Sequence, residues 1–194
     1  MLKLIRSFKI TLLIALLTVM VGCSSNTPEK NYFQLTSNLI NADSMTTHST
    51  NKFIWIESIE VASFLNKSGI VLQTQDIKYV TATNNLWAST LSQQFADRLS
   101  QDLTQLLPNY LVSTKSITTP TLTIKLFIDG FHGSYNGDAV IKGRWVVTDN
   151  KGQIRTKFID RSVPLATNGY DALVKALSQG WQDEEFEFAN SIKY

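Results

Sequence analysis

Three long runs in which apolar and polar residues alternate constrain the fold most strongly. They cover residues 121–131, 138–148 and 153–164 and are separated by short connections rich in Gly, Asn and Asp. In the first run the apolar positions share one face: Leu122, Ile124, Leu126 and Ile128. A period of two is typical of half-buried strands, and the connecting residues favour tight turns. The three runs therefore predict an antiparallel meander.

Two other segments have the spacing of amphipathic helices. In residues 86–107, apolar side chains recur every three or four positions, and Pro108 ends the pattern. In residues 170–192, which follow Asn168 and Gly169, a second apolar stripe has the same spacing. Each stripe covers one side of the helix and predicts one buried face.

Shorter strand candidates lie at residues 31–35, 52–62, 70–73, 77–82 and 110–112, and residues 41–51 form a polar loop. The order is strands, helix, strands, helix. This order predicts an α+β fold of one domain, with two helices packed on one face of a mostly antiparallel sheet.

The N-terminal segment has the pattern of an export signal. Its basic residues are Lys3, Arg6 and Lys9, and residues 10–21 are mostly apolar. Such a run is too short for a helix to cross a bilayer core of about 30 Å. The chain's single Cys, Cys23, stands directly after Gly22. This resembles a bacterial lipobox, rather than a plain signal peptide with a chance Cys or an uncleaved anchor.

A lipobox implies removal of residues 1–22, a lipidated linker over residues 23–30 and a periplasmic domain over residues 31–194. Lipidation of Cys23 also removes a thiol that has no partner for an internal disulfide. Several acyl chains give stable membrane attachment. In enterobacteria-like sorting an Asp after the Cys resembles an inner-membrane retention signal. Ser24 therefore favours the periplasmic face of the outer membrane.

The charge balance argues against nucleic acid as a partner. The chain has 18 basic and 16 acidic residues, and three of the basic ones lie in the signal. The mature chain is therefore close to neutral, without a basic cluster of the kind that binds phosphates.

A search for catalytic and metal-binding patterns finds none. The two His residues, His48 and His132, occupy a polar loop and a glycine-rich stretch that predicts a hairpin bend. Neither belongs to a metal-ligand or nucleophile motif. The acidic residues of 183–187 are interpreted as a solvated helix face. We therefore expect no catalytic residue, metal or cofactor.

The loop after residues 52–62 contains two large apolar residues, Phe64 and Leu65. Such residues either tuck under the loop as a satellite core or form a contact patch. The tryptophans lie on the buried side of their elements, and core packing is the default for them. Trp87, at the first turn of the predicted helix, is the one that could also have a functional role.

Six segments stand in a recognisable order: the lipobox, the aromatic strand 32–35, the block 56–73, Trp87-Ala88, the strand pair ending in Trp145, and residues 169–174 at the start of the last helix. Together they resemble the PqiC family of ABC-transport auxiliary lipoproteins. Asn66 and Lys67 stand where the family has Asp-Arg, and Lys does not replace Arg at a bidentate contact. Ser89-Thr90 also stand where Glu-Pro is usual.

The resemblance implies a non-enzymatic role in lipid traffic between two membranes. The implied partner is an inner-membrane-anchored tube protein built of mammalian-cell-entry (MCE) domains, which the lipoprotein docks at the outer membrane. We expect Phe64, Leu65, Lys67 and Trp87 to contact that partner or a neighbouring copy. Self-association is expected because a tube end has rotational symmetry. The alternatives are a stand-alone lipid- or small-ligand-binding lipoprotein, and a periplasmic hydrolase with an unrecognised site.

Overall fold

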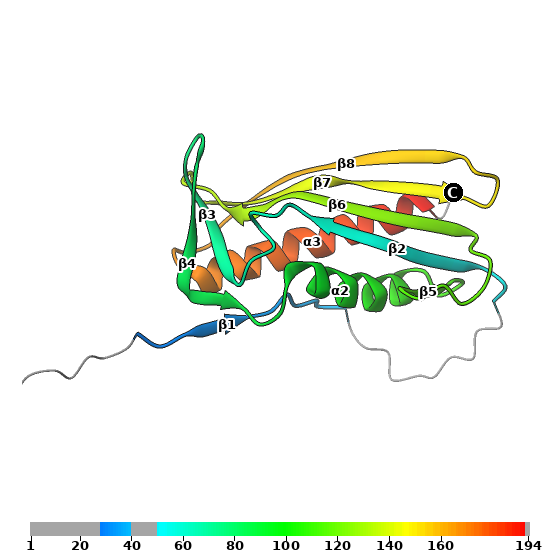
Figure 1. Ribbon diagram of the computed structural model, residues 1–194, viewed down its shortest axis with the longest axis horizontal. Coiled ribbons are helices and arrows are strands. Elements are labelled where there is room, and N and C mark those ends of the chain that lie inside the picture. Colours follow the sequence, from blue (N-terminus) through cyan, green and yellow to red (C-terminus); the bar gives the residue numbers. More distant parts are fainter. Residues whose placement is uncertain (1–27, 40–49, 193–194) are drawn as a thin grey trace, which may run out of the picture.

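The computed structural model describes residues 28–39 and 50–192 and consists of one sheet covered by two helices (Figure 1). Cys23 and His48 lie outside the described residues. The strands are β1 (Asn31–Phe33), β2 (Phe53–Val61), β3 (Gly69–Gln75), β4 (Lys78–Trp87), β5 (Leu111–Ser113), β6 (Leu122–Gly133), β7 (Asp138–Asp149) and β8 (Ile154–Pro164). The helices are α2 (Leu91–Leu106) and α3 (Tyr170–Ile192). No helix within these residues is long and apolar enough to cross a membrane.

Strand β6 organises the sheet. Along one edge it pairs with β7, which pairs with β8, and both pairings are antiparallel, as the meander predicted. Along its other edge β6 pairs with β2 in parallel and meets β3 at Gly133. Strand β5 extends the sheet from β2, and β4 and then β1 extend it from β3.

The sheet is mixed: its longest pairings are antiparallel, as predicted, and it is not purely antiparallel. The β2–β6, β2–β5 and β1–β4 pairings are parallel. Helix α2 lies between β2 and β6 in the chain, and a strand that returns after such a crossover can pair in parallel. Both helices pack on the same face of the sheet, as predicted (Figure 1).

Helix α3 has the predicted bounds, whereas α2 begins later than expected. Residues 78–87 continue as strand β4, so the helix starts at Leu91 rather than at residue 86. Thr90 is the N-cap, and its side-chain oxygen accepts a hydrogen bond from the backbone N–H of Gln93. A Thr at this position satisfies a backbone donor that the first turn leaves free.

The core between sheet and helices is filled with aromatic rings. Trp145 on β7 stacks against Phe188 and Trp181 of α3, with ring centroids 4.0 and 5.5 Å away. Phe95 of α2 meets Trp181 edge-on at 4.7 Å and Phe131 of β6 at 4.9 Å. Edge-on and stacked pairs add to the stabilisation that burial provides.

A glycine allows α3 to lie this close to the sheet. A Cβ atom on Gly180 would stand 2.8 Å from side-chain carbons of Ile141 on β7 and Val163 on β8. Real Cβ atoms do not approach other atoms so closely, so a larger residue there would force the Ile141 and Val163 side chains, or the helix, to shift.

The glycine-rich stretch at 130–137 is a turn only in its last part. Strand β6 continues through Gly133, with a register shift between Ile128 and Gly130. The turn occupies residues 134–137 and ends at Gly137, whose positive φ of 86° suits glycine. His132 therefore lies in a strand rather than in the bend that the sequence predicted.

Candidate functional site

The loop between β2 and β3 divides its two large apolar residues between core and surface. The Leu65 backbone N–H donates to the Ala62 carbonyl oxygen (2.9 Å), and this turn directs the Leu65 side chain into the core, where it is fully buried. Phe64 remains 36% exposed, and Lys67 is exposed. Leu65 is therefore a core residue, whereas Phe64 and Lys67 are exposed.

Trp87 is also a core residue. It ends β4, is only 3% exposed, and its ring lies 6.1 Å from that of Phe131. Its backbone N–H donates to the Ser68 carbonyl oxygen at 2.6 Å. The expectation that Trp87 contacts a partner is corrected, because the end of the strand carries its side chain beneath the helices instead of leaving it on a first helical turn.

Phe64 belongs to an aromatic cluster on the sheet surface opposite the helices. Its ring lies 5.3 Å from Tyr79 of β4, and Tyr79 meets the imidazole of His132 edge-on at 5.1 Å. His132 is 4% exposed, and its Nδ1 lies 3.0 Å from the Gly133 carbonyl oxygen. Burial lowers the pKa of His132, and the charge of Lys142 lowers it further against the effect of the Gly133 hydrogen bond. A neutral, covered imidazole is a packing residue here.

Asn66 links the same loop to the start of α2. Its side-chain oxygen lies 3.5 Å from the backbone nitrogen and the hydroxyl of Ser92. A side-chain oxygen at a helix N-terminus faces free backbone donors and the positive end of the helix dipole. Asn66 therefore holds the loop against the helix without a charge, and Lys67 is left facing solvent.

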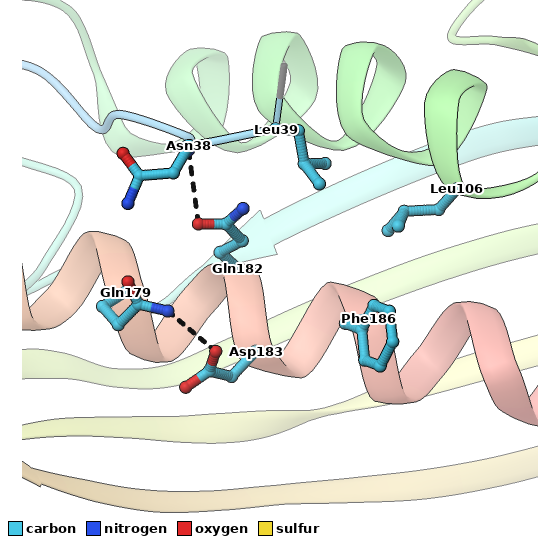
Figure 2. A pocket seen from close by; sticks show the side chains of 7 residues that line it. All are labelled: Asn38, Leu39, Leu106, Gln179, Gln182, Asp183 and Phe186. Atoms are coloured by element: carbon cyan, nitrogen blue, oxygen red, sulfur yellow. Dashed lines mark hydrogen bonds between the residues drawn. The ribbon is translucent and has the colours of Figure 1, made fainter.

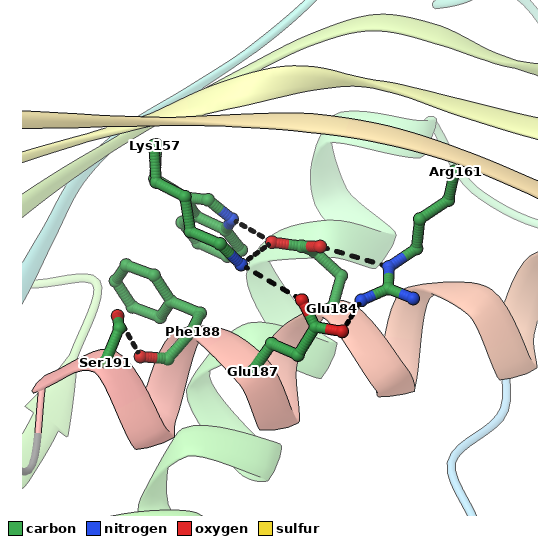
Figure 3. Close-up of polar contacts among 7 residues, drawn as sticks. Lys157, Arg161, Glu184, Glu187, Phe188 and Ser191 are labelled. Atoms are coloured by element: carbon green, nitrogen blue, oxygen red, sulfur yellow. Dashed lines mark hydrogen bonds and ion pairs between the residues drawn. The ribbon is translucent and has the colours of Figure 1, made fainter.

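The acidic residues of α3 are not all solvated, contrary to the sequence interpretation. Figure 3 shows Glu184 held from three sides. Its Oε1 accepts from Trp145 Nε1 (3.0 Å) and Lys157 Nζ (2.6 Å), and its Oε2 accepts from Arg161 Nε (3.1 Å). Lys157 and Arg161 also pair with Glu187 at the surface. This network fastens α3 to β7 and β8.

The sequence carried a signal for this network that periodicity alone did not resolve. Lys157 and Arg161 share one face of their strand, and Glu184 and Glu187 are three residues apart on a helix, where side chains are neighbours. An isolated buried carboxylate would be costly, but Lys157 and Arg161 pair with Glu184 and donate hydrogen bonds to it. A buried carboxylate is tolerated under these conditions. Hydrogen bonding to Arg161 lowers the pKa of Glu187.

Glu185 is buried in a different way, at the contact between the two helices. Trp181 Nε1 donates to its Oε1 at 2.8 Å, and the side chain is fully buried. Burial raises the pKa of Glu185 well above its ordinary value, and the neighbouring charge of Asp102 on α2 raises it further. Arg98 lies 3.6 Å from Asp102. The two carboxyl groups form a structural pair that favours a proton on Glu185.

The segment before the gap in the described chain lies across both helices. Gln94 of α2 accepts from the Leu35 N–H (2.8 Å), and Gln182 of α3 accepts from the Asn38 N–H (3.3 Å). Figure 2 shows the pocket beside it, of ≈ 240 Å³, with Leu106 and Phe186 facing each other across it. This pocket is smaller than the usual 300–1,000 Å³ of small-molecule sites, and its lining mixes polar and apolar side chains.

The described part of the chain contains no cluster of side chains that could bind a metal ion. Within residues 28–39 and 50–192, no group of three or more His, Cys, Asp or Glu side chains could hold a metal ion. Among the buried acidic groups, Glu184 joins α3 to the sheet, and Glu185 and Asp102 lie at the contact between the two helices.

Comparison with known proteins defines the class. Residues 33–185 match the model of a family described as "ABC-type transport auxiliary lipoprotein component". The chain is also 34% identical over 175 residues to the intermembrane transport lipoprotein PqiC of Escherichia coli, across 90% of this chain and 92% of that one. The PqiC protein of Shigella flexneri matches equally. The class is that of auxiliary lipoprotein components of ABC-type transport.

Solved structures agree with this assignment. A crystal structure of an uncharacterised protein that is 34% identical superposes with a TM-score of 0.75, covering 84% of this chain and 99% of that one. A Xanthomonas campestris protein with 11% identity has the same fold, with a TM-score of 0.63 over 81% of this chain and 92% of that one. The chain belongs to the ABC-type transport auxiliary lipoprotein family, as its resemblance to PqiC predicted.

Proposed function

We propose that this protein is the outer-membrane-anchored lipoprotein subunit of an MCE-type intermembrane lipid transport system. In this role Cys23 carries the lipid, residues 24–30 are the tether, and the domain docks the far end of a periplasmic tube. The observation that carries the proposal is the match to an intermembrane transport lipoprotein over 90% of the chain. The lipobox at the start of the sequence supports the anchor.

The filled core favours docking over lipid carriage. A protein that carries a lipid alone needs an apolar cavity, and here Trp145, Trp181 and Phe95 occupy the space between sheet and helices. The network around Glu184 then fixes α3 on the sheet. A rigid body of this kind suits a subunit that positions other proteins, because little of the surface has to move on binding.

Phe64 and Lys67 are the residues proposed to contact the tube protein or a neighbouring copy. They stand close together on one loop, and Leu65 and Asn66 fasten that loop to the core and to α2. Aromatic side chains are enriched at protein interfaces, and Phe64 is held on a rigid support. A ring of copies around the tube end would repeat this contact with the symmetry of the tube.

Fractionation of the cell envelope tests the anchor. We expect the wild-type protein in the outer membrane and Cys23→Ser in neither membrane, because its apolar attachment is lost. A Cys23→Ser protein that still fractionates with the outer membrane, in cells that behave normally, would contradict the proposal.

Co-purification tests the docking. Tagged lipoprotein should recover an MCE-domain protein from membranes that contain one, and Phe64→Ser with Lys67→Glu should reduce the recovery about tenfold, as expected for the loss of a central interface aromatic. Phe158→Ser is the matched control, because Phe158 is 76% exposed on β8, away from this loop. Equal recovery with both variants would refute the contact surface, and no recovery with wild type would refute the docking.

A further inference from the structure

We propose that the tip of the β3–β4 hairpin is a second contact with the lipid bilayer. Ile77 at the tip and Tyr135 beside it enter the membrane interface and fix the orientation of the domain. The proposal rests on the lipid anchor of the proposed function, and it adds a lipid-binding surface to the folded domain itself.

The tip carries the most exposed apolar side chain among those the structure describes. Ile77 is 94% exposed between the last residue of β3 and the first of β4. Tyr135, in the turn between β6 and β7, is 52% exposed. Both residues line a hollow of ≈ 430 Å³ together with Thr74, Gln75 and Asp76. Ile77 and Tyr135 therefore form an exposed apolar pair at the tip that the folded monomer does not cover.

Several polar groups of the tip are paired within the protein. The Tyr135 hydroxyl donates a hydrogen bond to the Asp76 carboxylate. Gln73 Nε2 donates to the Asp76 carbonyl oxygen (3.0 Å), and Thr74 Oγ1 donates to that of Lys78 (3.3 Å). An unpaired backbone group makes entry into an apolar phase costly. At the tip, the carbonyl oxygens of Asp76 and Lys78 already accept hydrogen bonds from side chains.

The shape of the tip fits a bilayer better than a protein. Ile77 projects from the hairpin turn with 94% of its surface exposed, and a fluid lipid surface accepts a projecting side chain without a complementary pocket. Tyrosine is enriched at membrane interfaces, where its ring is in the apolar region and its hydroxyl meets water. Lys78 next to the tip can reach lipid phosphate groups with its long side chain.

The length of the tether places the tip within reach of the same bilayer. Eight residues separate Cys23 from Asn31, and an extended chain of that length spans about 26–29 Å. Asn31 pairs with Asn85 on β4, and eight residues also separate Asn85 from Ile77, or about 26 Å along the strand. The described chain begins at the same end of the molecule as the hairpin and the β6–β7 turn (Figure 1). A lipid at Cys23 and the side chain of Ile77 can therefore meet one membrane.

Site-specific fluorescence in proteoliposomes tests this contact. The full lipidated protein carries Ile77→Cys, and its thiol is labelled with an environment-sensitive dye, because Cys23 is the chain's only native Cys and its sulphur is acylated. The vesicles contain phosphatidylethanolamine and phosphatidylglycerol, with or without spin-labelled lipid. Ile154→Cys is the matched control: Ile154 is 68% exposed and begins β8 at the opposite end of the molecule.

We expect the dye at position 77 to shift to the blue and to be quenched about twofold or more by spin-labelled lipid, as for a group at the acyl boundary. The dye at position 154 should stay unquenched. Equal quenching at both positions, or none at position 77, overturns the hairpin contact. A blue shift at position 77 that persists in detergent and is not quenched by spin-labelled lipid would show that protein, rather than lipid, surrounds the dye. That result also overturns the hairpin contact.

Flotation of the same vesicles separates this proposal from the anchor. Wild-type protein and both variants should float with the lipid, and the N-terminal peptide should carry acyl chains by mass spectrometry. Flotation without quenching at position 77 refutes the hairpin contact and leaves the anchor intact. Failure of the wild type to float, with an unmodified Cys23, refutes the anchor and the hairpin contact with it.

Discussion

On the helix-covered face of the sheet, Trp145, Trp181 and Phe188 are stacked away from solvent, whereas at the β3–β4 end Ile77 and Phe64 are exposed. The first group lowers the free energy of the folded state by leaving water. The second group gives the isolated domain little such benefit. Comparing the two regions separates residues that hold the molecule together from residues available for contacts with other molecules.

Charged groups differ between the regions in the same way. On the helix side, Glu184 is 2% exposed and bound by a tryptophan and two cations. At the hairpin end, Lys67 and Lys78 are exposed. The buried network joins helix to sheet, whereas the exposed cations remain available to a partner or a membrane.

The largest expected effect comes from the aromatic stack. Trp181→Ala should lower the free energy of unfolding by about 3–5 kcal/mol, because it removes a large buried side chain and leaves a cavity. Urea denaturation measures this. Phe158→Ala, at a ring that is 76% exposed, is the control and should stay within about 0.5 kcal/mol of wild type. Similar losses in both variants would contradict the division into two regions.

Glu184→Ala should have the next largest effect. It leaves the buried Trp145 Nε1 without its acceptor and removes the central partner of Lys157 and Arg161. Both cations can still reach Glu187 and solvent, so we expect a loss of about 2 kcal/mol rather than the larger cost of a stranded buried charge. Glu187→Ala, at the exposed end of the same network, should cost less than about 1 kcal/mol. If the two variants lose equally, the buried carboxylate has no special role.

Glu185 should give the network between the helices a pH dependence. Its raised pKa means that the folded chain binds this proton more tightly than the unfolded chain. Its contribution to stability is therefore complete below the ordinary value of 4.5 and is lost as pH rises through the raised value. Glu185→Gln should stabilise the protein relative to wild type at pH 8 more than at pH 5.

Thermal unfolding from pH 5 to pH 8 measures this difference. Glu187→Gln is the control: hydrogen bonding to Arg161 lowers the pKa of Glu187, so its difference from wild type should stay constant from pH 5 to pH 8. Its contribution is present above the ordinary value of 4.5 and is lost as pH falls. A Glu185→Gln profile parallel to that of wild type would show that the carboxyl pair does not hold a proton in the folded protein.

The smallest effect on stability is expected at the exposed aromatic cluster. Phe64→Ser gives up the contact with Tyr79 and should cost about 1 kcal/mol or less. Its effect on recovery of an MCE-domain protein should be much larger than its effect on unfolding. A loss of stability as large as that of Trp181→Ala would place Phe64 with the core residues and remove it from the contact surface.

Local patterns in the sequence determined much of the architecture. The alternation in residues 121–164 predicted β6, β7 and β8 with their antiparallel pairing, because the turns between them are short and rich in turn-forming residues. The apolar stripe of 170–192 predicted α3 at its true bounds. Ordered short motifs also indicated the family, as the comparisons showed.

Tertiary structure decided which strands meet across the chain and which polar side chains are buried. The parallel pairing of β2 with β6 depends on the path of the chain around α2, which no local pattern contains. Glu184 is buried because the sheet register places Lys157 opposite Trp145, beneath the same turn of α3. Leu65 and Trp87 entered the core because a turn and a strand end directed them inward. Periodicity reports which face of one element is apolar, whereas burial depends on what another element places against it.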